Sequence, residues 1–166
     1  MAILTFNDFI NEDLDDSPKR SPKVAAGIAA IWDNKILLIH PTGSSWQKGT
    51  CGIPKGGIEP GEDTMEAAIR EFREEAGIDV SPEMLDSEPH KVIFYNKKMK
   101  ETGHMIYYVC KINDLSELGL SSERLPKDKL QLEEVDWGKF VSAKEAYPIM
   151  NRAQLIILDR HLSLDK

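Results

Sequence analysis

Three glutamates crowd the segment "REFREEAGI", which runs from Arg70 to Ile78. Glu71, Glu74 and Glu75 are three and four residues apart, which makes them neighbours on a helix, where like charges repel. The last two precede a glycine and would lie in the final helical turn, where the helix dipole disfavours anions. A divalent cation would relieve both costs, because carboxylate oxygens are ligands for hard cations such as Mg²⁺. Taken alone, the cluster has an alternative reading as a solvated acidic face paired with the neighbouring arginines.

The segment "DTMEAAIREFREEAG" carries the signals of the helix that would position these carboxylates. Asp63 with Glu66 three residues later predicts a capping box at its start. Gly77 predicts its end, since glycine readily adopts the left-handed conformation that stops a helix. The glutamates lie beside an apolar stripe that would face the core, formed by Met65, Ala68, Ile69, Phe72 and Ala76.

The glycine-rich stretch "IPKGGIEPGED" stands directly before this helix. Counted from Gly56, five residues lead to Glu62 and seven more lead to Arg70. Together with the glutamates, this spacing matches every fixed position of the Nudix box, G-x5-E-x7-R-E-U-x-E-E-x-G-U, where U is a bulky aliphatic or aromatic residue. The chain therefore resembles a Nudix hydrolase over residues 24–162, with residues 1–23 as an N-terminal extension.

The resemblance implies an α/β (α+β) Nudix fold, with a mixed β-sheet sandwiched between helices and the box as a loop–helix–loop. It implies hydrolysis of a diphosphate linkage in a nucleotide polyphosphate with Mg²⁺, for which Mn²⁺ can substitute. The metal ligands would be Glu71, Glu74, Glu75 and the carbonyl of Gly56. The same three glutamates are the catalytic candidates, with Glu74 or Glu75 as the base that takes a proton from the attacking water.

Other carboxylates and one arginine have supporting or alternative roles under this resemblance. Arg70 would orient a glutamate by ion pairing, and Glu62 would support the loop. Glu133 and Glu134 in "LEEVDW" are candidate bases outside the box, with a plain surface pair as the alternative.

Three residues are candidates for contact with the substrate. The Pro-Lys-Gly sequence resembles that of diadenosine tetraphosphate hydrolases, so Lys55 is expected to meet phosphate, unless it is a solvated loop lysine. Tyr95 lies seventeen residues beyond the box and would stack on a base, unless it only packs. Lys97 would contact a long phosphate chain, with a solvated hairpin tip as the alternative. The signatures of ADP-ribose and coenzyme A hydrolases are missing, and a likeness to predicted nucleoside-triphosphate pyrophosphohydrolases fixes only the reaction class.

Two rival functions share these motifs. One is a non-catalytic Nudix module that binds nucleotide as a sensor, although such modules usually lose a box glutamate. The other is an RNA 5′-end or cap pyrophosphohydrolase, which would need a basic channel for its substrate. The net charge of −7 argues against such a channel and against binding to duplex nucleic acid.

The remaining sequence predicts strands, a hairpin at Asp33–Asn34 and a capping box of Ser142 with Glu145. An extended piece is expected near residues 51–53. Pro148 is expected to interrupt the helix that the capping box opens, and the helix continues over 149–162 with Ile149, Ala153, Ile156 and Ile157 on one face. Cys51 and Cys110 are expected to be reduced thiols. No apolar run is long enough to span a membrane, and no signal peptide is recognised, so we expect a cytoplasmic protein. We expect it to be a monomer or a homodimer.

Overall fold

The structure, a computed structural model, describes residues 23–164. The predicted extension over residues 1–23 therefore lies outside the described residues, except for Lys23, which begins the first strand. Within the described range, no helix is both long and apolar enough to cross a bilayer.

The strands are β1 (Lys23–Trp32), β2 (Lys35–Pro41), β3 (Lys55–Gly57), β4 (His90–Tyr95), β5 (Glu101–Lys111) and β6 (Val135–Val141). The α-helices are α2 (Thr64–Ala76), α3 (Ala143–Ala146) and α4 (Leu155–His161). Single 3₁₀ turns are η2 (Trp46–Lys48), η3 (Pro82–Met84), η4 (Leu115–Leu118), η5 (Lys127–Lys129) and η6 (Arg152–Gln154).

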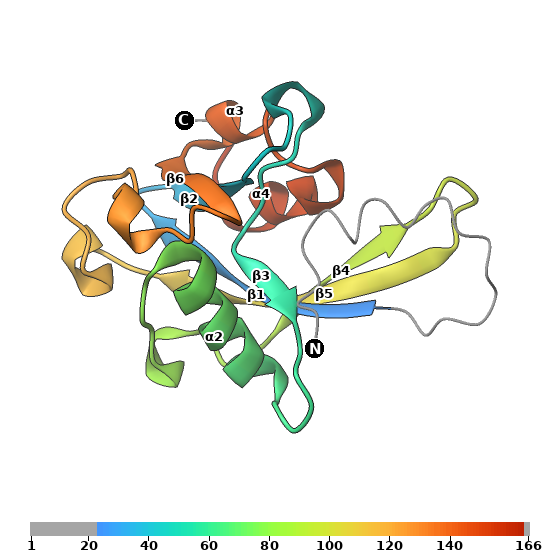
Figure 1. Cartoon of the computed structure of the whole chain (residues 1–166), viewed down its shortest axis with the longest axis horizontal. Coiled ribbons are helices and arrows are strands. Elements are labelled where there is room, and N and C mark those ends of the chain that lie inside the picture. Colours follow the sequence, from blue (N-terminus) through green and yellow to red (C-terminus); the bar gives the residue numbers. More distant parts are fainter. Residues whose placement is uncertain (1–22, 165–166) are drawn as a thin grey trace.

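One mixed sheet organises the molecule, in the order β4-β5-β1-β2-β6 (Figure 1). The pair β1–β5 is parallel and the other pairs are antiparallel. Strands β1 and β2 pair only beside their turn, where Asp33 and Asn34 take positive φ as the hairpin prediction requires. Beyond that point they part, and residues 51–57 fill the gap between them. Gly52 bonds to Ile39 of β2, and β3 pairs with β1.

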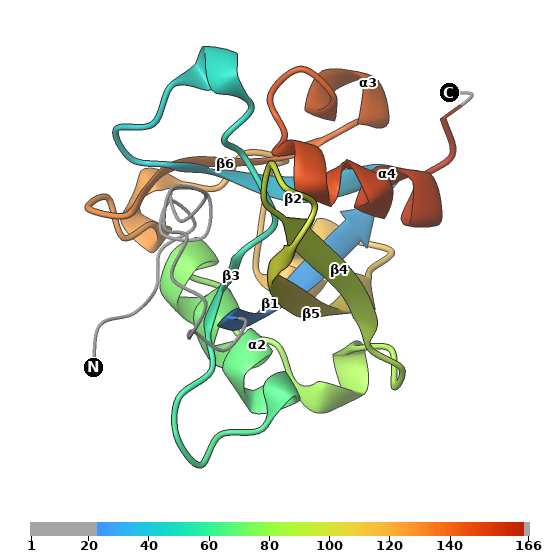
Figure 2. The same cartoon turned by 90° about the vertical axis from the view of Figure 1, so that its right-hand side faces the viewer.

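Helices cover both faces of the sheet, as the predicted sandwich requires. In Figure 2, α2 lies below the sheet while α3 and α4 lie above it. Phe72 of α2 belongs to the core on one face, and Ile157 and Leu158 of α4 belong to the core on the other. The box helix is therefore held on a fully packed sheet, which fixes the direction of its side chains.

The helix α2 forms as the sequence predicts. Asp63 accepts the backbone N–H of Glu66, and the Glu66 side chain accepts that of Asp63, so the capping box is complete. Gly77 ends the helix at φ 68°. Ala68, Phe72 and Ala76 of the predicted stripe are fully buried, while its other two members pack at the edge of the core.

The C-terminal helix differs from its prediction. The capping box of Ser142 and Glu145 is present and α3 ends before Pro148, as predicted, but α4 begins only at Leu155 and not at residue 149. Between them Met150 forms a β-bridge with Cys51, so the chain is extended there and the two helices do not share one continuous helical repeat. The predicted stripe is therefore wrong at Ile156, which is exposed.

A polar cluster fastens α4 to the edge of the sheet. The Tyr107 hydroxyl lies 2.9 Å from Nε2 of His161, and the Arg160 guanidinium donates to the carbonyl of Lys91. The ring of His90 stacks on that of Tyr107. Burial, with His90 and Arg160 close by, lowers the pKa of His161, so folding favours its neutral form.

Candidate active site

Glu71 is the most buried carboxylate of the box and lies against Gly56. Its side chain comes from the sheet-facing side of α2, and the residue is only 1% exposed. A Cβ built on Gly56 would lie 2.1 Å from the carboxyl carbon of Glu71, so no other residue fits there without movement. Burial raises the pKa of Glu71 to about 7, although Arg70 opposes the shift. The predicted neighbours Gly56 and Glu71 are thus in direct contact.

Arg70 connects the loop of the box to its helix. Its guanidinium donates two hydrogen bonds to Glu62, at 2.8 and 2.9 Å, and one to the carbonyl of Gly57. Its Nη1 also lies 2.8 Å from Glu71 Oε1 and 3.2 Å from Glu74 Oε2. These contacts are the ion pairing that the resemblance implies for Arg70. They also lower the pKa of Glu62, because the paired carboxylate is stabilised as an anion.

Glu75 faces β3 on the other side of the cluster. Its Oε2 accepts a 2.9 Å hydrogen bond from the backbone N–H of Lys55. Burial raises the pKa of Glu75, and the nearby negative charges of Glu71 and Glu134 raise it further. The side chain of Lys55 is only 3% exposed, and burial lowers its pKa, against the attraction of Glu75 and Glu71. The alternative of a solvated loop lysine is therefore wrong.

Of the two carboxylates predicted outside the box, Glu134 is the one whose charge affects the pKa of the box glutamates. Its negative charge acts on both Glu71 and Glu75, whereas Glu133 is not among the main causes of either shift. Glu134 is solvent-exposed and precedes β6, and its carbonyl accepts the N–H of Thr42.

The box and the segment before β6 meet at Gly77. A Cβ on this glycine would lie 2.2 Å from the carbonyl oxygen of Lys129. Gly77 is thus required both for its left-handed backbone and for this close approach.

The carboxylates are gathered but are not arranged around a common point. Within residues 23–164, no three acidic, histidine or cysteine side chains converge as ligands of one metal ion. The carboxylates instead have partners within the chain, because Arg70 bonds to Glu71 and Glu74, and Glu75 accepts the backbone N–H of Lys55. The donor set itself fits a hard divalent cation, since it consists of oxygens beside a backbone that only glycine allows.

A family model described as the NUDIX domain matches residues 21–159, more than half of the chain. The chain belongs to the Nudix family.

Relatives and solved structures agree with this membership. The bis(5′-nucleosyl)-tetraphosphatase [asymmetrical] of Caenorhabditis elegans is 39% identical over 70 residues, which are 42% of this chain and 50% of that protein. The chain thus spans about half the length of this curated relative. The crystal structure of a C. elegans Ap4A hydrolase binary complex has a TM-score of 0.57 at 23% identity, over 83% of this chain and 93% of that one. A bifunctional NMN adenylyltransferase/ADP ribose pyrophosphatase of Francisella tularensis, complexed with AMP and a Mn ion, has a TM-score of 0.62 at 17% identity, over 93% of this chain and 45% of that one. Both structures share the Nudix fold.

Two predicted substrate contacts lie far from the Nudix box. Gly56 pairs with Ala26, Ala26 with Ile106 and Ile106 with Lys91, and Tyr95 lies four residues further along β4. Three strand spacings and four residues of strand place Tyr95 about 20 Å from Gly56. Lys97 follows in the exposed hairpin tip, which projects at the right of Figure 1, away from α2. Only a long ligand would touch both regions.

The burial of Lys55 is the feature that the sequence reading missed. A signal was available in Gly27, which interrupts an otherwise apolar strand, because a glycine there often marks close approach of another backbone. A Cβ on Gly27 would lie 2.8 Å from Cβ of Lys55 and from the carbonyl oxygen of Pro54.

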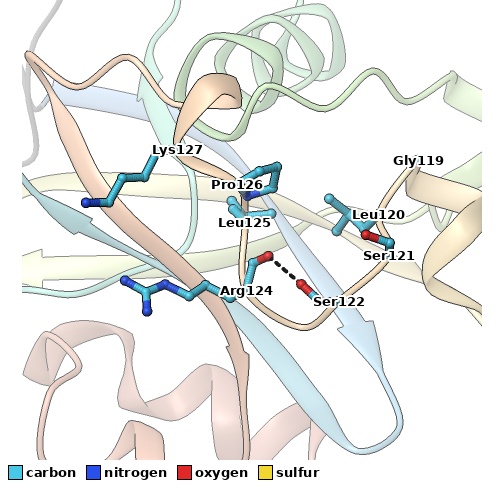
Figure 3. A pocket seen from close by; sticks show the side chains of 8 residues that line it. All are labelled: Gly119, Leu120, Ser121, Ser122, Arg124, Leu125, Pro126 and Lys127. Carbon is cyan, nitrogen blue, oxygen red and sulfur yellow. Dashed lines mark hydrogen bonds between the residues drawn. The ribbon is translucent and has the colours of Figure 1, made fainter.

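A hollow of about 550 Å³ lies elsewhere, along residues 119–127 (Figure 3). Arg124 and Lys127 extend to one side of it, away from Leu120 and Ser121. None of its lining residues belongs to the Nudix box, so we do not assign the chemistry to it.

Proposed function

We propose that this chain is a divalent-metal-dependent hydrolase that cleaves a diphosphate linkage in a nucleotide polyphosphate. The observation that carries the proposal is the Glu71 carboxylate, which lies buried against Gly56 and in reach of the negative charges of Glu74 and Glu134. A buried carboxylate with other negative charges close by is costly unless positive charge compensates it. A divalent cation held by these oxygens would supply that charge.

Each box residue has a defined part in this proposal. Glu71, Glu74, Glu75 and the Gly56 carbonyl would hold Mg²⁺ or Mn²⁺, which would offset phosphate charge and acidify a bound water. Arg70 keeps the Glu71 carboxylate in place through its 2.8 Å contact.

Three carboxylates compete for the role of general base. Glu74 and Glu75 are the candidates from the box, but Oε2 of Glu74 already accepts a bond from Arg70 and Oε2 of Glu75 accepts one from the backbone N–H of Lys55. Glu134 is exposed to water and its charge reaches the box, which favours it as the proton acceptor. The variants E74Q and E134Q separate these roles, with E133Q as the matched control. Loss of the base should lower kcat by about 10²–10⁴ and remove the acidic limb of the pH–rate profile, while E133Q stays near wild type.

Dinucleoside polyphosphates are the substrates that we propose first. The Pro-Lys-Gly sequence before the box and the similarity to a bis(5′-nucleosyl)-tetraphosphatase support this choice. Nucleoside triphosphates are the next class of substrate to test. ADP-ribose is tested as well, because one Nudix protein of similar fold is named as an ADP ribose pyrophosphatase.

The decisive experiment is a substrate panel with Mg²⁺ or Mn²⁺, with products resolved by chromatography. The panel contains diadenosine tetraphosphate, nucleoside triphosphates, nucleotide sugars, ADP-ribose and capped RNA, and E75Q serves as the inactive control. The proposal is supported if the wild type cleaves a polyphosphate and E75Q does not. Tight nucleotide binding without any product would instead identify a sensor module.

A further inference from the structure

The tip of the β4–β5 hairpin is strongly basic, although the chain as a whole has a net charge of −7. Three exposed lysines, Lys97, Lys98 and Lys100, stand within four positions of the sequence. No acidic residue occurs from residue 89 to residue 100. An acidic partner would therefore be attracted to this tip and disfavoured by the net negative charge of the rest of the chain.

Two large apolar side chains accompany these lysines. Met99 is 75% exposed and Tyr95 is 52% exposed, the two highest values among the large apolar residues that the structure describes. Met99 also has a positive φ of 61°, a backbone conformation that favours glycine or asparagine, so the turn by itself does not call for a methionine. Exposed apolar area next to charged side chains is typical of a contact surface. We call the following five residues the hairpin surface: Tyr95, Lys97, Lys98, Met99 and Lys100.

Strand β1 begins beside this surface. Its first residue, Lys23, pairs with Gly103 of β5, and the two strands run parallel. The start of β1 therefore lies at the end of β5 from which the hairpin projects (Figure 1). Lys100 is three residues before Gly103, so about 10 Å of strand separates the start of β1 from the nearest lysine of the hairpin surface.

The sequence that precedes Lys23 has the composition that the hairpin surface would attract. We call residues 6–16, "FNDFINEDLDD", the acidic segment, because it contains five acidic residues and no basic one. It also contains apolar side chains, at Phe6, Phe9 and Ile10. Asp16 is seven residues before Lys23, and seven residues can span up to about 25 Å, which exceeds the distance to the hairpin lysines.

We propose that the acidic segment docks on the hairpin surface of its own chain. Its carboxylates pair with the three lysines, and its apolar side chains cover Tyr95 and Met99. Single exposed ion pairs contribute little, so the contact depends on several charges acting together with the apolar cover. Docking would shield Lys97 and Lys100 from other polyanions. The inference goes beyond the proposed hydrolase function and does not require it.

The first test measures protection of Met99 from oxidation in the whole chain. Limited treatment with hydrogen peroxide, followed by mass spectrometry, gives the rate at which each methionine forms its sulfoxide. The variant E12Q/D13N/D15N/D16N removes four charges of the acidic segment. Met99 should be oxidised several-fold faster in this variant than in the wild type, and also in wild type at about 0.5 M salt, which screens exposed charges. Equal rates under all three conditions would overturn the proposal.

Met84 provides the internal control for the oxidation rates. It lies in η3, and Asp86 shortly after it donates its backbone N–H to the carbonyl of Val109. Val109 is six residues beyond Gly103, so Met84 belongs to the opposite end of β5 from the hairpin. Its oxidation rate should be the same in every variant.

A charge exchange tests whether the two groups of charges act on each other. K97E/K98E/K100E should lose the protection of Met99, because the acidic segment is then repelled. E12K/D13K/D15K/D16K should lose it as well. Combining the two sets should restore protection, since opposite charges again face each other. A combined variant that is no better protected than either parent would overturn the proposal.

The last test identifies the occupant. An equal mixture of ¹⁵N-labelled and unlabelled wild type is treated with a carbodiimide, which joins paired carboxylates and amines without a spacer. Cross-links from the acidic segment to Lys97, Lys98 or Lys100 should join peptides of the same label. Mixed-label cross-links would show that a second copy is the occupant and would overturn docking within the chain. Cross-links mainly to Lys144, an exposed lysine of α3, would overturn the choice of surface.

These outcomes are separable from those of the substrate panel. None of the three tests contains nucleotide, metal or turnover. Cleavage of a polyphosphate without protection of Met99 would leave the hydrolase proposal standing and remove the docking. Protection of Met99 without cleavage of any substrate would have the opposite meaning.

Discussion

Replacing Gly56 by alanine tests the contact on which the site depends. The added Cβ would lie 2.1 Å from the carboxyl carbon of Glu71 and 2.3 and 2.4 Å from its oxygens, so the carboxylate must move. The backbone of residue 56 is not at positive φ, so the substitution strains only this contact. Overpacking of this kind costs about 1–3 kcal/mol. For a chain of this size, that lowers Tm by roughly 2–12 °C.

The neighbouring Gly57 provides the control within the same strand. A Cβ there meets nothing within 4 Å, and its φ is also not positive. G57A should therefore be neutral or up to about 1 kcal/mol more stable, because alanine has less freedom to lose on folding.

The assay combines thermal melts of metal-free protein with calorimetric titration of Mn²⁺. G56A should melt lower than G57A and bind Mn²⁺ more than about tenfold more weakly. The double variant G56A/E71D, in which the carboxylate is one methylene shorter, should recover part of the lost stability but not the metal binding. If G56A melts and binds metal as G57A does, the assigned contact between Gly56 and Glu71 is wrong.

Three further outcomes follow from the contacts described above. Because the folded protein lowers the pKa of His161, its contribution to stability is complete above the unfolded value of about 6.5 and is lost as the pH falls below it; melts at several pH values should show a shallower acid loss in H161Q than in wild type. R70K should lower both the free energy of unfolding and kcat, because lysine cannot keep the paired hydrogen bonds to Glu62. Urea unfolding measures the first and single-turnover kinetics the second, and wild-type values in both would refute this role of Arg70. Y95A should leave KM for nucleoside triphosphates unchanged, since Tyr95 lies about 20 Å from Gly56 by strand spacing; only a long dinucleoside polyphosphate should show a higher KM, and equal effects on both substrates would contradict this placement.

The box helix could be predicted closely from the sequence because its signals are local. The Asp63–Glu66 capping box, the spacing of the apolar stripe and Gly77 each specify the backbone within a few residues. The family resemblance then supplied the sandwich around it, which the comparisons confirm.

The features that the sequence did not predict depend on pairing between distant segments. Pro148 predicts the interruption of the C-terminal helix, but nothing near Met150 predicts its bridge to Cys51, which keeps the chain extended beyond the proline. Likewise, Lys55 is buried because β3 enters the gap between β1 and β2, which requires knowledge of the sheet order. Periodicity within a segment does not report either contact.

The close approach of Gly77 to the Lys129 carbonyl has a consequence for protein engineering. Residues 56–78 contain all the fixed positions of the Nudix box, which suggests that this segment could be transferred to another protein by itself. In this molecule, however, Gly77 at the end of the segment packs against the backbone of Lys129, some fifty residues downstream and shortly before Glu134. A graft of residues 56–78 into another scaffold would carry the three glutamates without the segment on which Gly77 rests, so the host would also have to provide a matching backbone surface.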